Sequence, residues 1–203
     1  MATEKQSLVA VGASTGGTKA LATLLAQLPG QLAQYGLPVE PIIAVTQHID
    51  SGFARALADS LNKAGSLQVS LAENGEQMES GRVYLAPGDS HLLVDCCDGN
   101  YFCRLGDGPP RDKCKPSVDA LFESLAAHSL DQVIGVLLTG MGKDGAKGLL
   151  AMHQQGAYTV AQDEDSSVIW GMPGEAVRLG AVNDVVAIDE MAEKIASVLA
   201  TRK

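Results

Sequence analysis

Apolar and polar positions along the chain predict strands and helices in alternation. Two short apolar runs, residues 7–11 and 41–46, have the pattern of strands buried on both faces, as in a parallel sheet. Between them the Ala- and Leu-rich residues 18–28 predict a helix, which we expect to end at Pro29-Gly30. A second helix is predicted over residues 52–64. The first third of the chain therefore has a β-α-β-α pattern.

The middle of the chain has a different pattern. Four short strand-like runs follow one another closely, separated by turn residues, at residues 67–71, 82–86, 91–95 and 101–105. The segments between them are too short for crossover helices, so we expect antiparallel hairpins here. A polar loop, residues 106–116, ends this region.

Strand and helix patterns alternate again in the last third of the chain. The whole order predicts an α/β fold, a doubly wound, mostly parallel sheet with helices on both faces and an antiparallel hairpin insertion. No linker-like stretch interrupts it, so we expect a single domain over residues 1–203. The remaining predicted strands are 133–138, 158–161 and 182–188, and the remaining helices are 118–128, 146–155, 173–179 and one that begins at 189.

Composition narrows the classes of function. The 203 residues are 46% hydrophobic, which excludes a disordered chain, and their net charge is −9. Because no basic run is present, nucleic acid is not an expected partner. No apolar run approaches the ~18 residues of a membrane span, so we expect no membrane insertion and a cytoplasmic location. Four cysteines lie within residues 96–114, and we interpret them as reduced thiols without a metal.

Three residues with catalytic chemistry follow predicted strands. Ser14 lies in Gly12-Ala13-Ser14-Thr15-Gly16 after the first strand, His48 follows the second, and Asp144 follows the strand at 133–138. Ligands of open parallel sheets bind beyond the carboxyl ends of the strands. A serine, a histidine and an aspartate gathered at this edge predict an acyl-transfer triad, and G-x-S-x-G is the form of a sharp turn that exposes a serine hydroxyl.

Each of the three residues also has a purely structural interpretation. Ser14 can cap the helix that follows its glycine turn, His48 can be a buried structural histidine, and Asp144 can cap the next helix. The glycines around Asp144 exceed what a helix cap requires. Taken together, the three positions favour a hydrolase.

A dinucleotide-binding protein is the rival from another class. The spacing Gly12-x-x-x-Gly16-Gly17 after a first strand is similar to a pyrophosphate-binding turn. The acidic residue expected at the end of the second strand is replaced by Gln47-His48, which leaves Asp50 as a weak substitute. We therefore expect no cofactor.

Six ordered motifs spread over about residues 7–200 resemble the catalytic domain of the CheB chemotaxis methylesterases. The order serine, histidine, aspartate differs from that of α/β-hydrolases, which favours independent convergence on the same chemistry. The motifs are Gly12-Ala13-Ser14-Thr15-Gly16-Gly17, Thr46-Gln47-His48, Ala86-Pro87-Gly88-Asp89 with His91, Lys115-Pro116-Ser117-Val118-Asp119, Leu138-Thr139-Gly140-Met141-Gly142 with Asp144-Gly145, and Gly171-Met172-Pro173.

The resemblance implies hydrolysis of glutamate γ-methyl esters, and deamidation of glutamines, on the cytoplasmic helices of methyl-accepting chemoreceptors. It assigns the nucleophile to Ser14, the base to His48 and the acid to Asp144, with backbone amides of Thr15 and Met141 for the oxyanion and no metal or cofactor. The receiver domain that usually precedes this domain has no room before the first strand, so a separate receiver protein is one expected source of control. The alternative function is a catalytically silent module that docks on receptors.

Overall fold

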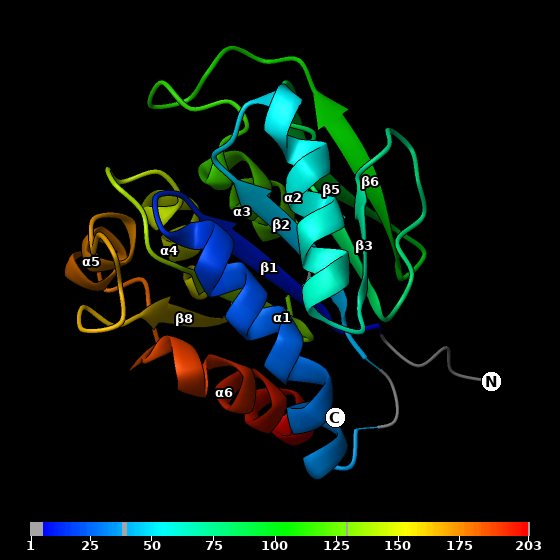
Figure 1. Ribbon diagram of the computed structural model, residues 1–203, viewed down its shortest axis with the longest axis vertical. Coiled ribbons are helices and arrows are strands. Elements are labelled where there is room, and N and C mark those ends of the chain that lie inside the picture. Colours follow the sequence, from blue (N-terminus) through cyan, green and yellow to red (C-terminus); the bar gives the residue numbers. More distant parts are fainter. Residues whose placement is uncertain (1–5, 38–39, 129, 203) are drawn as a thin grey trace.

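The computed structural model describes residues 6–37, 40–128 and 130–202, and within them it contains one parallel sheet and one separate strand pair (Figure 1). The seven-stranded sheet has the order β3-β4-β2-β1-β7-β8-β9, and β5 pairs with β6. The doubly wound α/β prediction is thus confirmed. The strands are β1 (Leu8–Ala13), β2 (Ile42–Gln47), β3 (Gln68–Leu71), β4 (Arg82–Leu85), β5 (His91–Cys97), β6 (Asn100–Gly106), β7 (Val133–Leu137), β8 (Tyr158–Gln162) and β9 (Asp184–Val186).

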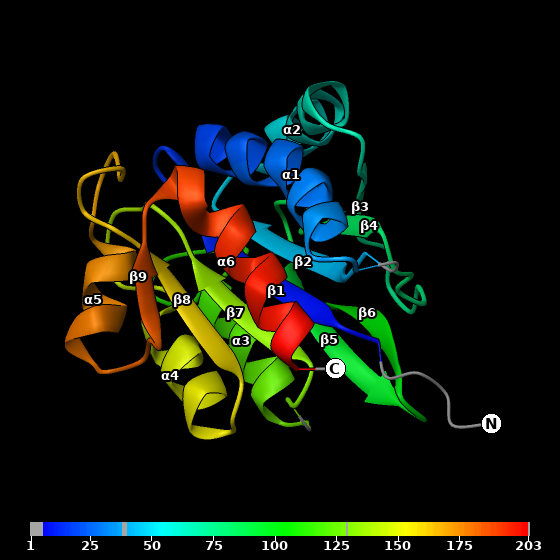
Figure 2. The same cartoon turned by 90° about the horizontal axis from the view of Figure 1, so that it is seen from below.

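Helices cover both faces of the sheet, as Figure 2 shows from below. One face carries α1 (Gly17–Gln34), α2 (Ser51–Ala64) and α6 (Ile188–Thr201). The other carries α3 (Val118–Ala126), α4 (Ala146–Gln154) and α5 (Met172–Arg178), together with the β5–β6 pair. The sheet is therefore the middle of three layers.

The central strand explains this layering. All six residues of β1 are buried, and successive side chains of a strand point to opposite faces. Val9 and Val11 pack into the core under α1, α2 and α6, whereas Leu8 and Ala10 pack into the core with α3 and α4. A strand that is apolar at every position is the signal of a sheet covered on both sides.

The strand order places a ligand crevice at the middle of the sheet. From β1 the chain crosses to β2 on one side, and it later returns to form β7 on the other side of β1. The ends are nearly level, because Ala13 is paired with Gln47 and Gly12 with Leu137. The carboxyl ends of β2, β1 and β7 thus meet at a topological switch point, the usual ligand position in such sheets.

Antiparallel hairpins were expected throughout the middle region, and this is right for only one pair. β5 and β6 form an antiparallel hairpin, but β3 and β4 are parallel neighbours at the edge of the main sheet. Their connection, residues 72–81, crosses without a helix. It is held by Met78, which is fully buried and whose N–H donates to the carbonyl of Tyr101 on β6. The β5–β6 hairpin therefore supports this crossover connection, as a helix supports the other crossover connections of the sheet.

Helix α1 does not end at Pro29-Gly30 as predicted. It continues to Gln34 with Pro29 inside it. Leu28 and Leu32 lie one turn apart and are both buried, so the apolar face continues past the proline. Burying a leucine contributes about 1.5–3 kcal/mol, comparable with the ~3 kcal/mol cost of an interior proline. Tertiary packing therefore overrides the local stop signal.

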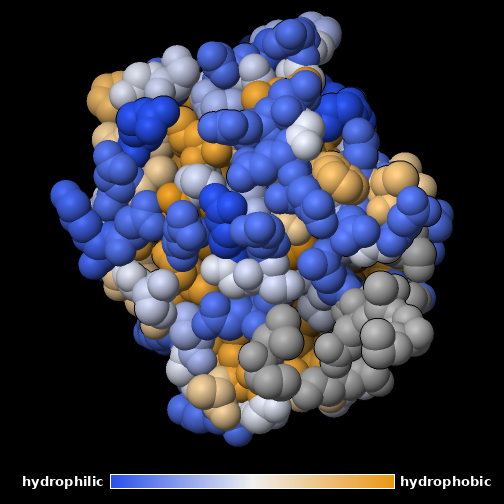
Figure 3. Space-filling view, turned by 90° about the vertical axis from the view of Figure 1, so that its right-hand side faces the viewer, coloured by the Kyte–Doolittle hydropathy of each residue, from blue (hydrophilic) through white to orange (hydrophobic). Residues whose placement is uncertain are grey.

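The hydrophobic residues of the chain lie mostly inside the protein. On the face shown in Figure 3, hydrophilic side chains cover most of the area and hydrophobic residues are scattered between them. None of the helices within the described residues has both the length and the apolar character that crossing a bilayer requires.

Candidate active site

The structure places the three predicted residues at neighbouring strand ends. Ser14 directly follows β1 and His48 directly follows β2. Asp144 lies in the turn between β7 and α4. The N–H of His48 donates to the carbonyl of Ala13 at 3.0 Å, which extends the parallel ladder by one step and sets His48 beside Ser14. The switch point of the sheet is therefore the candidate active site.

His48 and Asp144 are joined by a short hydrogen bond. The Nε2 atom of His48 lies 2.7 Å from Oδ2 of Asp144, and the side chains are 14% and 2% exposed. An ionised carboxylate can only accept, so Nε2–H is the donor. The Nδ1 atom of a neutral ring is then an acceptor. In the serine-protease arrangement Nδ1 faces the aspartate and Nε2 faces the serine. In this protein Nε2 faces the aspartate, which leaves Nδ1 for the serine.

Asp144 is held by the first turn of α3. Its Oδ1 accepts from the hydroxyl of Ser117 at 2.8 Å and from the N–H of Asp119 at 3.1 Å, and its Oδ2 accepts from the N–H of Val118 at 2.7 Å. Burial opposes its ionisation, but the bonds from His48, Val118, Asp119 and Ser117 hold the pKa of this carboxyl below its ordinary value. Asp144 therefore stays an anion beside the imidazole.

The alternative interpretation of Asp144 as the cap of its own helix is wrong. The residue at that position of α4 is Gly145, at φ 90°, and the N–H of Gly148 in the first turn of α4 donates to the side chain of Asp119. The carboxylate caps α3 instead, where the partial positive charge of the helix N-terminus stabilises an anion. The carboxylate of Asp144 thus binds the first turn of α3, and the carboxylate of Asp119 binds the first turn of α4.

The backbone of Ser14 is bound by the turn after β7 on one side and by the side chain of Gln47, at the end of β2, on the other. Its N–H donates to Thr139 at 3.0 Å, and its carbonyl accepts from the N–H of Gly17 and from Nε2 of Gln47. A methyl group on Gly140 would lie 2.7 Å from the Cβ of Ser14, so the turn after β7 packs directly on the serine. Among the described residues, no group is hydrogen-bonded to the Ser14 hydroxyl. The hydroxyl is partly exposed and available to a partner.

The predicted oxyanion donors, Thr15 and Met141, flank Ser14. Thr15 is the next residue along the chain, and Met141 follows Gly140, which touches Ser14. Within the described part of the chain neither backbone N–H has an acceptor, and both side chains are exposed. Unused donors beside a nucleophile are what an oxyanion hole needs. Their assignment to that role remains a prediction.

Gly12, the first residue of the motif around Ser14, is required by the packing of α3 on β1. A Cβ added to Gly12 would lie 2.1 Å from Cγ1 of Val118, the first residue of α3. Only a residue without a side chain lets α3 approach β1 this closely. This approach carries the amides that bind Asp144 into the site.

Sequence reasoning missed several residues of the site. Ser117 was predicted only as the cap of α3, which it is, since its Oγ accepts from Ala120; it also donates to Asp144. Asp119 is buried and accepts from the N–H of Gly148 at 2.7 Å; burial and the nearby charge of Asp144 raise its pKa to about 6. The motif at residues 115–119 was the signal for both residues.

His91, the first residue of β5, holds the loop that precedes α3. Its ring is buried, with Nδ1 accepting from the N–H of Ser117 at 3.0 Å and Nε2 donating to the carbonyl of Pro109 at 3.1 Å. The ring therefore links both ends of the loop to β5. His91 is a structural support for α3 and is not paired with any of the cysteines.

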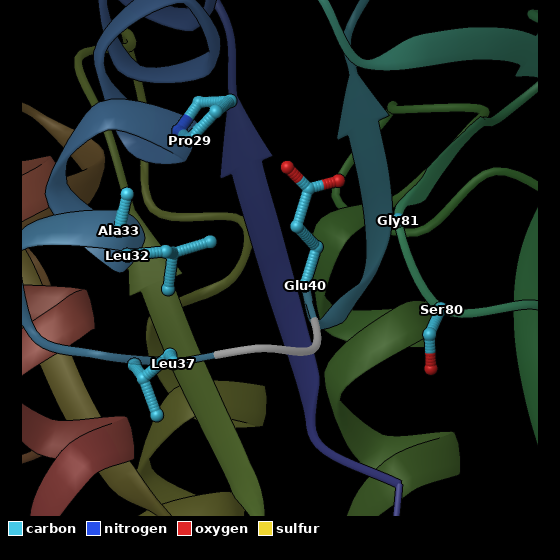
Figure 4. Close-up of a pocket in the computed structure, with 7 residues that line it drawn as sticks. All are labelled: Pro29, Leu32, Ala33, Leu37, Glu40, Ser80 and Gly81. Carbon is cyan, nitrogen blue, oxygen red and sulfur yellow. The ribbon is translucent and has the colours of Figure 1, made fainter.

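A hollow of about 370 Å³ lies elsewhere on the molecule (Figure 4). Glu40 in its wall precedes β2, whereas His48 follows that strand. The hollow is therefore at the opposite end of β2 from the candidate active site, and no predicted site residue lines it. Its lining residues are Pro29, Leu32, Ala33, Leu37, Glu40, Ser80 and Gly81.

One group of side chains has the composition of a metal site. Ligand atoms of His48, Cys114 and Asp144 all lie within 4.8 Å of one another. Within the described residues no other such group of three occurs. All four cysteines are free thiols, as predicted. Cys114 was not expected to lie beside His48.

Comparison with known proteins gives consistent matches. The family described as CheB methylesterase matches residues 9–195. Two proteins named protein-glutamate methylesterase/protein-glutamine glutaminase, from Yersinia pestis and Salmonella typhimurium, are 46% and 44% identical over 190 residues, 94% of this chain and 52% of each relative. The chain thus spans about half the length of these curated relatives.

A solved structure matches the whole fold. The crystal structure of the Thermotoga maritima CheB methylesterase catalytic domain superposes with a TM-score of 0.88 at 32% sequence identity. The match covers 96% of this chain and 100% of the Thermotoga chain.

Proposed function

Because the chain belongs to the CheB methylesterase family, we propose that it hydrolyses glutamate γ-methyl esters on the cytoplasmic helices of methyl-accepting chemoreceptors, and deamidates glutamines there. Ser14 is the nucleophile, His48 the general base and Asp144 the acid that orients it. The observation that carries the proposal is the 2.7 Å bond between Nε2 of His48 and the buried Asp144 carboxylate, at the strand end beside Ser14.

Acylation starts from the neutral imidazole. Nδ1 of His48 accepts the Ser14 proton while the serine oxygen attacks the ester carbonyl, and Asp144 stabilises the imidazolium that results. The N–H groups of Thr15 and Met141 donate to the oxyanion of the tetrahedral intermediate. His48 then returns its proton to the leaving methoxide, so methanol departs and a glutamyl ester of Ser14 remains.

Deacylation repeats these steps with water. His48 removes a proton from the water that attacks the acyl-enzyme, and returns it to the Ser14 oxygen as the glutamate carboxylate is released. With a glutamine substrate the same first step releases ammonia in place of methanol. Neither reaction uses a metal or cofactor, so the protein groups of the switch point are sufficient for both.

The proposed partners are the chemoreceptors themselves. The charge of −9 and the absence of a basic run disfavour a nucleic-acid partner. Control of the activity is proposed to come from a receiver domain, in a separate protein or in a longer form of this one. The relatives are about twice the length that this chain matches.

Methanol release from methylated receptor fragments tests the activity. Wild-type protein should turn over repeatedly, and Ser14→Ala should lose about 10³-fold or more in rate while keeping the fold. Ser60→Ala, an exposed serine on α2, is the matched control and should behave as wild type. Full turnover by Ser14→Ala would exclude the assignment of the nucleophile. Receptor binding without any wild-type turnover would favour the silent docking module.

A further inference from the structure

A thiol from the loop before α3 lies against the imidazole–carboxylate pair. Sγ of Cys114, a ring nitrogen of His48 and a carboxylate oxygen of Asp144 lie within 4.8 Å of one another. These residues come from three separate segments, the end of β2, the loop before α3 and the turn after β7. The serine esterase chemistry has no use for Cys114, since neither nucleophile nor base needs a thiol.

The backbone holds Cys114 in this place. Arg111 and Cys114 exchange two backbone hydrogen bonds, of 3.0 and 2.7 Å, across a tight turn. Both residues of the turn, Asp112 and Lys113, have positive φ. His91 fixes the same loop at Pro109 and at Ser117. The loop that carries Cys114 is thus held by hydrogen bonds at its turn and at both of its ends. The position of the thiol is therefore set by the backbone of the loop as well as by the Cys114 side chain.

The three ligand types suit a thiophilic divalent cation. Thiolate, imidazole and carboxylate all bind Zn²⁺, with bonds of about 2.3, 2.0 and 2.1 Å, and tetrahedral bonds of that length separate their ligand atoms by about 3.4–3.6 Å. The 2.7 Å between His48 and Asp144 is shorter than this, so the ring has to swing out by about 0.7 Å. His48 and Cys114 are partly exposed, which gives the cation a path from solvent.

We propose that His48, Cys114 and Asp144 form an inhibitory binding site for Zn²⁺ or a similar thiophilic divalent cation. The cation replaces the proton between Nε2 of His48 and Asp144. The ring stays neutral because the proton displaced from Nε2 is taken up at Nδ1, and the Cys114 thiol loses its proton to solvent. Because Nδ1 is then protonated, it cannot accept the Ser14 proton. Binding is independent of the proposed function, whereas inhibition rests on it.

The other cysteines offer an internal comparison. Cys96, Cys97 and Cys103 lie on β5 and β6, away from the triad, and belong to no ligand group within the described residues. Exposed Cys97 is the matched control for Cys114, because its thiol contacts the exposed carboxylate of Asp98 but belongs to no group of three ligands within the described residues. A metal response that depends on Cys114 and not on Cys97 therefore identifies the site.

Cobalt substitution tests binding without using activity. Co²⁺ added to the wild-type protein should produce a thiolate-to-cobalt charge-transfer band, visible bands of tetrahedral Co²⁺ and loss of both on addition of Zn²⁺. Cys97→Ser should retain the charge-transfer band, whereas Cys114→Ser should lose it and His48→Gln should weaken cobalt binding. No band in wild-type protein, or an unchanged band in Cys114→Ser, would overturn the proposal.

Inhibition is measured separately. Zn²⁺ should stop methanol release by wild-type protein and a chelator should restore it. Relative to its own metal-free rate, Cys114→Ser should need at least about 10- to 100-fold more Zn²⁺ for the same inhibition. Losing a residue that only hydrogen-bonds a metal ligand already weakens metal binding by this factor, and Cys114 is itself a proposed ligand. Equal sensitivity of the two proteins would refute the inhibitory role. A cobalt band in a protein without esterase activity would instead overturn the proposed function and leave the metal site standing.

Discussion

Asp119 provides a direct test of the electrostatics behind the site. This carboxyl is 6% exposed and lies one residue into α3, next to the amides that bind Asp144. Burial first, and then the charge of Asp144, raise its pKa from 3.8 to about 6, against the opposing hydrogen bond from Gly148. We predict that Asp119→Asn abolishes a pH dependence of stability that the wild-type protein has.

The magnitude follows from linkage. Between pH 3.8 and about 6 the unfolded chain releases the Asp119 proton while the folded chain keeps it, so the free energy of unfolding falls as the pH rises. At about 1.4 kcal/mol for each pKa unit, the loss is about 3 kcal/mol and is complete above about pH 6. The amide that Asp119→Asn introduces does not titrate, so relative to wild type the variant gains about this much stability between about pH 4 and pH 7.

Urea unfolding at a series of pH values measures this difference. A cost of the amide that does not depend on pH, such as an altered bond to Gly148, lowers the free energy of unfolding of the variant equally at every pH. It therefore leaves the pH dependence of the difference between variant and wild type unchanged. Asp59→Asn, an exposed carboxylate on α2, is the control and should follow the wild-type curve. A variant-minus-wild-type difference that stays constant from about pH 4 to about pH 7 would refute the buried, high-pKa carboxyl.

Three further changes test other parts of the site. Asp144→Asn should lower kcat about 10⁴-fold with little change in KM, because the amide favours the wrong imidazole tautomer, and a loss below tenfold in the methanol assay would contradict this role. His91→Phe removes both bonds that hold the loop and should cost about 1–3 kcal/mol in urea unfolding; unchanged stability would show that the loop is held otherwise. Gly12→Ala should cost about 1–3 kcal/mol by collision with Val118, and adding Val118→Ala should recover part of it; no recovery would place the strain elsewhere.

Local patterns in the sequence were sufficient for the framework. The uninterrupted apolar runs at β1, β2 and β7 predicted a parallel sheet, because only strands covered on both faces have this composition. The chemical residues at the ends of these strands were visible too, since Ser14, His48 and Asp144 each come directly after an apolar run or its glycine turn. Strand identity and strand ends are short-range properties.

Neighbour relations across space required the tertiary structure. The spacing of residues 67–86 could not reveal that β3 and β4 are parallel, because the buried Met78 in their connection is bound to β6, which is distant in sequence. Likewise, Pro29 was a valid local stop signal that the burial of Leu32 overrode.

The site shows the same division. The sequence alone determined which side chains reach the carboxyl edge of the sheet. Only the fold decided that Nε2 of His48 faces Asp144, that this carboxylate binds the first turn of α3 rather than of α4, and that Cys114 approaches both. The physical reason is that a strand's own residues set its burial and its ends, whereas hydrogen-bond partners depend on which distant segments pack against it.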